Sequence, residues 1–157
     1  MSEPATELTL TRTFNAPRDL VFRAWTDPEL LSQWWGPNGV TTPVCEVDAV
    51  IGGKLNIVML AGEELGPMAG AEWPMTGVYR EITPPEKIVY DASPVVEGQP
   101  IMDTLNTVTF EEENGKTKLT LHIAVTRITP AADGPLAGME MGWNQSLDKL
   151  VSYVNAR

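Results

Sequence analysis

The pattern of hydrophobic and polar positions is most regular at the end of the chain, where apolar residues recur every three or four positions. This apolar stripe consists of Leu136, Met139, Trp143, Leu147, Leu150 and Val154. Polar residues fill the opposite face: Glu140, Asn144, Asp148 and Ser152. Such spacing predicts one long amphipathic helix over residues 133–156. Asp133 can cap its first turn, and Pro135 is tolerated there.

Gly138 and Gly142 lie one turn apart on this predicted helix, beside Trp143. An interior glycine costs a helix roughly 1 kcal/mol relative to alanine. The pair therefore indicates close approach by another element or by a ligand. Tight packing of the helix on a sheet is the more common of the two reasons, and we expect it here.

Most of the preceding chain alternates between apolar and polar residues, as strands with one buried face do. Strands are predicted over residues 8–14, 42–50, 54–61, 73–83, 87–93, 104–112 and 116–126. Gly52-Gly53 and Asn114-Gly115 are turn signals that predict two hairpins. Residues 62–72 and 94–100 are predicted loops, and Pro84-Pro85 ends a strand.

Two short helices are predicted between the first strand and the rest, over residues 17–25 and 28–35. Pro17 and Pro28 suit the first turn of each helix, and Asp27 or Thr26 can cap the second. Strands followed by a long helix predict an α+β fold, with a curved antiparallel sheet around the C-terminal helix.

The composition excludes some classes of function but does not identify one. The net charge is −10, which opposes binding to nucleic acid or to anionic membranes. No apolar stretch approaches the roughly 20 residues that span a bilayer, and residues 1–7 lack the pattern of a secretory signal. We therefore expect a cytoplasmic protein.

Several segments of the chain resemble one known family. They are TRTFNAPRDLVFRAWTDPELLSQWWGP, CEVD with GGKLNIVM, GVYREITPPEKIVYD, TVTFEEENGKTKLTLH and GWNQSLDKLVSYV. In this order, over residues 8–154, they resemble the homologues of the activator of the heat-shock-chaperone ATPase, within the START-like (SRPBCC) superfamily. The resemblance implies a helix-grip fold of the START-like or Bet v-like type, with a hydrophobic cavity between sheet and helix.

The resemblance does not imply one activity, because such proteins include lipid and steroid carriers, aromatase/cyclases and proteins that sequester toxic metabolites. We expect a single START-like domain over residues 8–156 and a flexible N-terminus over residues 1–7. The co-chaperone that gives the family its name carries an additional N-terminal chaperone-binding domain. This sequence starts directly with the grip domain, so the chaperone-stimulating role is expected to lack that half.

Aromatic residues and methionines are the main candidates for contacts with a ligand. Methionine suits surfaces that adapt to varied apolar molecules, and a small-molecule site is mostly apolar. We predict that the cavity is lined by Trp35, Met59, Trp73, Met139 and Trp143, with Asn56, Arg80 and Asn106 as its polar side chains. The predicted loop over residues 62–73 is a candidate gate.

No sequence motif for catalysis is present, and we expect no metal and no cofactor. His122 is the only histidine and alternates with apolar neighbours, so we expect it on the surface. Cys45 is expected to be a small buried residue. The carboxylates Glu46, Asp48 and Asp91 are expected to face outward.

Three functions remain open from sequence. The favoured hypothesis is binding of a small hydrophobic or aromatic ligand in the cavity. The second is a cyclase/aromatase-like or hydratase-like enzyme, which needs a carboxylate or Arg80 facing inward. The third is stimulation of a chaperone ATPase. Val58 and Leu60, expected to be exposed, point to a covered sheet surface or a homodimer.

Overall fold

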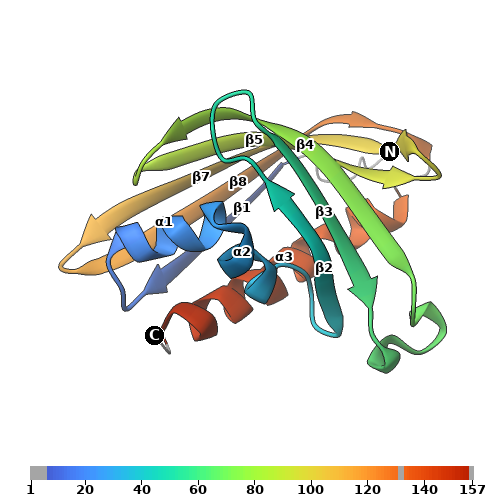
Figure 1. Cartoon of the computed structure of the whole chain (residues 1–157), viewed down its shortest axis with the longest axis horizontal. Coiled ribbons are helices and arrows are strands. Elements are labelled where there is room, and N and C mark those ends of the chain that lie inside the picture. Colours follow the sequence, from blue (N-terminus) through green and yellow to red (C-terminus); the bar gives the residue numbers. More distant parts are fainter. Residues whose placement is uncertain (1–6, 131–132, 156–157) are drawn as a thin grey trace.

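The chain forms a strongly curved antiparallel sheet that arches over a long C-terminal helix (Figure 1). The computed structural model describes residues 7–130 and 133–155, with residues 133–138 described by their backbone only. The helices are α1 (Arg18–Thr26), α2 (Pro28–Trp34), the 3₁₀ helix η1 (Glu63–Met68) and α3 (Asp133–Asn155). The strands are β1 (Glu7–Phe14), β2 (Val40–Val47), β3 (Lys54–Ala61), β4 (Glu72–Thr83), β5 (Lys87–Val96), β6 (Gln99–Pro100), β7 (Met102–Glu113) and β8 (Lys116–Ile128).

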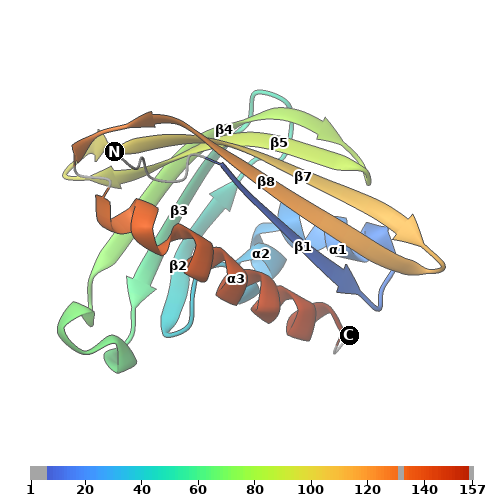
Figure 2. The same cartoon turned by 180° about the vertical axis from the view of Figure 1, so that it is seen from behind.

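The strand order is β1-β8-β7-β5-β4-β3-β2, every pairing is antiparallel, and β6 pairs only with β5. β1 and β2 form opposite edges, so α1 and α2 carry the chain from one edge to the other. Figure 2 shows α3 running along the concave side of the arch. This architecture confirms the predicted helix-grip fold.

The inner face of the sheet is apolar because alternate residues of each strand point toward α3. On β7 and β8, Val108, Phe110, Leu119 and Leu121 are almost completely buried. Asn114 and Gly115 between them have φ values of 53° and 80°. Positive φ at both central residues is the geometry that Asn-Gly favours, and it confirms the predicted hairpin.

The glycine pair Gly52-Gly53 also lies in a turn, but the turn is longer than expected because β2 ends at Val47. Only Gly52 has a positive φ, of 83°. Gly53 is required for a different reason: a Cβ built on it would lie 1.9 Å from the carbonyl oxygen of Asp48. One glycine supplies the turn, and the other permits close contact of two backbone segments.

The two predicted loops contain regular structure. Residues 62–72 include η1, and residues 94–100 include the end of β5, a turn at Glu97-Gly98 and β6. The strand predicted over residues 87–93 was too short, because β5 continues through Pro94 to Val96. Pro94 has no N–H to donate, but its carbonyl accepts from the Ile101 N–H at 2.9 Å, which continues the pairing.

Helix starts and faces follow the sequence closely where they are described. Asp27 caps α2 by accepting from the Glu29 N–H at 3.0 Å, so Asp27 and not Thr26 is the cap. Leu147, Leu150 and Val154 bury the apolar stripe of α3. The predictions for Asp133, Pro135, Leu136 and Gly138 lie outside the residues whose side chains are described.

Two expectations need revision. Glu7 was assigned to a flexible N-terminus but is the first residue of β1, while residues 1–6 lie outside the described part of the chain. Val58 and Leu60 are half-buried, not exposed. They therefore do not form the exposed apolar surface from which a homodimer was inferred.

Candidate functional site

A cavity of about 520 Å³ lies between the inner face of the sheet and α3. Its wall contains residues of β3, β4, β5, β7, β8 and α3, together with the segment after α2 and Met68 of η1. A volume in this range is typical of small-molecule sites, which are concave and mostly apolar. The cavity is therefore the candidate functional site.

Six of the eight side chains predicted to bind a ligand lie in this wall. They are Trp35, Met59, Trp73, Asn106, Met139 and Trp143. They come from elements far apart in sequence, and the fold brings them together because alternate strand residues and one helix face point to the same interior. Their contact with a ligand stays a prediction.

Asn56 and Arg80 do not line the cavity, contrary to expectation. Asn56 alternates with buried Leu55 and Ile57 on β3, so it faces outward and donates to Glu46 at 3.1 Å. Arg80 is exposed on β4, where its Nε donates to Asp91 at 2.6 Å. In both cases the two-residue period of the strand places the polar side chain on the outer face.

The sequence also left several wall residues unassigned to the site. Tyr90, Ile101, Thr104 and Ser146 line the cavity. Tyr90 could have been assigned, because it shares the inner face of its strand with Ile88. Ser146 follows Trp143 by three positions on α3, and that helical spacing was the available signal.

Tryptophans fix the shape of the wall near the middle of α3. The Trp143 ring packs edge-on against Trp35, with ring centroids 5.1 Å apart. It also stacks on Trp25 of α1, with centroids 6.0 Å apart and an interplanar angle of 13°. Trp34 lies behind this cluster, fully buried, and its Nε1 donates to the Ala24 carbonyl at 2.9 Å. The aromatic wall is thus rigidly supported by both short helices.

Gly142 has a different role from the one expected. It lines the cavity, and a Cβ built on it would meet no atom of another element within 4 Å. Tight packing of the helix on the sheet is therefore not the reason for this glycine. Its missing side chain leaves space that belongs to the cavity.

The segment after α2 is held to α3 by polar contacts at the cavity rim. Lys149 Nζ donates to the carbonyl oxygen of Gly36 at 2.9 Å, and the Asn38 N–H donates to Gln145 Oε1 at 2.9 Å. Burial lowers the pKa of Lys149. Because Gly36 and Pro37 line the cavity, these contacts fix part of its wall.

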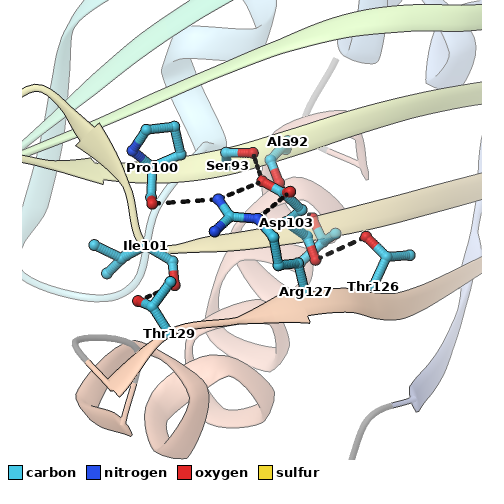
Figure 3. A network of polar contacts seen from close by, with 9 residues as sticks. Ala92, Ser93, Pro100, Ile101, Asp103, Thr126, Arg127 and Thr129 are labelled. Carbon is cyan, nitrogen blue, oxygen red and sulfur yellow. Dashed lines mark hydrogen bonds and ion pairs between the residues drawn. The ribbon is translucent and has the colours of Figure 1, made fainter.

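A second polar network fixes the wall where β6 leads into β7 (Figure 3). Arg127 Nε donates to Asp103 Oδ2 at 2.7 Å, and its Nη2 donates to the Pro100 carbonyl at 3.3 Å. The Thr129 N–H and hydroxyl both donate to the Ile101 carbonyl. Ile101 lines the cavity, so this outer network holds an inner surface in place.

None of the described residues in the wall carries a charged side chain. Tyr90 is the titratable one, and burial raises the pKa of its hydroxyl well above the ordinary value, so it stays protonated. Its Oη and the Trp25 Nε1 are buried and form no hydrogen bond with the described residues. Both side chains also border a smaller void of about 10 Å³, deeper in the core.

The other reactive side chains lie away from the cavity. His122 is on the surface as expected, with its Nε2 3.1 Å from Glu7 Oε1. Cys45 is half-buried against the core, and burial raises its pKa to about 11. Among the described residues no cluster of three or more His, Cys, Asp or Glu side chains could hold a metal ion. None of the described helices is long and apolar enough to cross a bilayer.

The comparisons with known proteins agree with this architecture. Residues 15–155 match the model of the family described as activator of Hsp90 ATPase homolog 1-like protein. No curated protein is significantly similar to the chain.

Solved structures with the same fold cover almost the whole chain. A protein from Chromobacterium violaceum is 29% identical, with a TM-score of 0.80 and coverage of 96% of this chain and 97% of that one. The AHSA1 protein from Silicibacter pomeroyi is 25% identical, with a TM-score of 0.76 and coverage of 93% and 95%. A protein from Arthrobacter aurescens is 22% identical, with a TM-score of 0.80 and coverage of 98% and 88%, and shows the fold alone.

Proposed function

Because the chain belongs to the activator of Hsp90 ATPase homolog 1-like family, whose fold is consistent with ligand binding, we propose that it binds a small hydrophobic or aromatic molecule in the cavity between the sheet and α3. The observation that carries this proposal is a space of about 520 Å³ with tryptophan and methionine walls and no charged side chain among its described residues. Transfer of an apolar molecule from water into such a space is favourable.

The methionines support a site that accommodates ligands of varied shape. Met59, Met68, Met75, Met102 and Met139 line the cavity. Their side chains are flexible and polarisable, so they can adjust to different apolar surfaces and contact aromatic rings favourably. Trp35 and Trp143 provide a rigid aromatic surface against which a ring can pack.

The enzymatic alternative is less well supported. It required a carboxylate or Arg80 facing the cavity as an acid or base. Arg80 and Asp91 instead pair with each other on the outer face. The Tyr90 hydroxyl is buried, and its raised pKa keeps it protonated, so it is neither an available base nor a good acid.

The proposal can be tested by filling the cavity from α3. N-phenyl-1-naphthylamine is an uncharged fluorescent probe whose emission rises in apolar surroundings. We expect it to bind the native protein and to quench tryptophan emission, since three tryptophans lie in the wall. Gly142→Phe should weaken that binding at least tenfold, because the new ring occupies space that is now open.

A matched substitution separates this effect from damage to the helix. Met141 is the preceding residue and is 65% exposed, so Met141→Phe should leave probe binding unchanged. Replacement of Gly142 should not destabilise the fold, because glycine is among the least favourable residues in a helix. Equal binding by the native and Gly142→Phe proteins, or no binding of the probe by the native protein, would overturn the proposal.

A further inference from the structure

Asn106 is a polar side chain of the cavity wall whose hydrogen bonds leave its acceptor unused. Asn106 lies on the inner face of β7 and is only 2% exposed. A buried amide is costly unless its donors and acceptor are paired. The fate of each of its polar atoms therefore indicates what the cavity can bind.

The two amide hydrogens of Asn106 are both used. Nδ2 donates to the Tyr90 carbonyl at 3.3 Å and to Thr104 Oγ1 at 3.0 Å. Thr104 in turn donates its hydroxyl hydrogen to the Ala92 carbonyl at 2.9 Å, so toward Asn106 it can act only as an acceptor. The Tyr90 carbonyl is also only an acceptor. Both partners therefore require the NH₂ side of the amide, and this fixes its orientation.

The oxygen of the same amide is left over. Oδ1 accepts no hydrogen bond from any residue that the structure describes, although Asn106 lines the cavity. Among the described residues, the polar side-chain atoms that are both inaccessible to solvent and unpaired are Trp25 Nε1 and Tyr90 Oη. Asn106 Oδ1 is not one of them. Oδ1 therefore borders the open space and presents a fixed acceptor to it.

On this basis, and resting on the proposed function, we propose that the cavity selects uncharged, largely apolar molecules that carry an O–H or N–H group, and that Asn106 Oδ1 accepts the hydrogen bond from that group. A ligand without a donor leaves the amide oxygen buried and unpaired, which costs affinity. A charged ligand would lose its hydration without meeting an opposite charge in the described wall.

Two ring compounds that differ in one donor test this selection on the native protein. 2-Naphthol carries an O–H, and in 2-methoxynaphthalene a methyl ether replaces it. Dissociation constants are measured by displacement of N-phenyl-1-naphthylamine. The ether is the more hydrophobic compound and would bind better in a purely apolar pocket. We expect 2-naphthol to bind at least tenfold more tightly instead.

Asn106→Leu removes the acceptor and should reduce the preference for 2-naphthol to a ratio of about one or below, mainly by weakening 2-naphthol. Asn56→Leu, an asparagine on the outer face, should leave the ratio unchanged. Thermal unfolding establishes that each variant is folded. If Asn106→Leu does not fold, the binding of 2-naphthol and 2-methoxynaphthalene to the native protein tests the inference by itself.

The outcomes distinguish this inference from the function on which it rests. Equal or tighter binding of the ether by the native protein, or an unchanged ratio in folded Asn106→Leu, would overturn the selection by Asn106 while the binding function stands. Failure of N-phenyl-1-naphthylamine to bind the native protein would overturn both.

Discussion

Arg12 Nε donates to Asp148 Oδ1 at 3.0 Å and thereby joins the edge strand β1 to α3. The same guanidinium donates to Asn144 Oδ1 at 2.8 Å, one helical turn away. Arg12 shares the inner side of β1 with Leu8 and Leu10, so its charged end reaches the rim of the helix while its stem covers apolar surface. These contacts hold α3 against the sheet on the side away from β2.

We therefore expect Arg12→Met to lower the free energy of unfolding by about 1–2 kcal/mol, since it removes charge-assisted hydrogen bonds to two helix residues at a partly exposed site. Urea denaturation measures this change. Lys87→Met is the comparison, because Lys87 pairs with Glu81 at 3.6 Å between exposed side chains and should contribute at most about 0.5 kcal/mol. Similar losses in the two variants would contradict the role given to Arg12.

Most of the fold could be predicted from the sequence, because the patterns that predict its helices and turns are local and strong. The three-four spacing of Trp143, Leu147, Leu150 and Val154 predicts α3 without reference to any other element. Asn114-Gly115 predicts its hairpin by backbone preference alone. The errors fall where tertiary pairing overrides local preference, as at Pro94, whose carbonyl is used by Ile101.

The residues of the cavity wall could be predicted from the sequence only in part. Alternation assigns a residue to one face of a strand, and this was sufficient for Met59, which shares its face with Leu55 and Ile57. Trp73 was chosen for its aromatic side chain, and alternation fails there because Pro74 and Met75 line the cavity too. Asn56 and Arg80 were chosen for their polarity, although the same alternation places them outside. The unused acceptor of Asn106 depends on its two partners, Tyr90 and Thr104, and on the bond from Thr104 to Ala92, and no local pattern reveals such a network.

The hydroxyl of Tyr90 supplies a second prediction, about stability. It is buried and forms no hydrogen bond with the described residues. An unpaired buried hydroxyl costs about 1–3 kcal/mol, so its removal relieves a cost. Tyr90→Phe should leave the free energy of unfolding unchanged or raise it by about 1 kcal/mol, measured by urea denaturation.

Tyr79→Phe is the comparison, since Tyr79 packs beside Tyr90 with ring centroids 6.2 Å apart. Its Oη is not among the sealed, unpaired atoms, so its removal should not stabilise the protein. A clear loss of stability in Tyr90→Phe would show that the hydroxyl has a partner, such as a water molecule in the adjoining void of about 10 Å³.

Because of Asp103, the stability of the folded protein should depend on pH in the acidic range. Hydrogen bonds from Arg127 and Ser93 lower the pKa of its carboxyl below the ordinary value of 3.8. The folded state thus binds this proton less tightly than the unfolded state. The resulting stabilisation is fully present above about pH 5 and declines as pH falls through the lowered pKa of the folded state.

Asp103→Asn should therefore reduce stability by a constant amount at neutral pH, and the difference from the native protein should shrink as the pH falls below about 4. Thermal unfolding across this range measures it. In an Arg127→Met background the pH-dependent difference should be much smaller, because the largest cause of the lowered pKa is gone. A difference that grows toward acid pH would reverse the assigned sign.

Cys45 provides a direct chemical measure of burial on the sheet. Burial raises its pKa from 9.0 to about 11, so its thiolate fraction at pH 7 is about 100-fold lower than that of an ordinary cysteine. Iodoacetamide reacts with the thiolate, and Cys45 is the only cysteine, so mass spectrometry follows a single site.

Alkylation of the folded protein at pH 7 should be at least about 100-fold slower than in urea, where the thiol is solvated. The folded rate should keep rising beyond pH 9, because a thiol with a raised pKa continues to ionise there. A plateau near pH 9, or equal rates in the two states, would show that Cys45 is accessible to solvent in the folded protein.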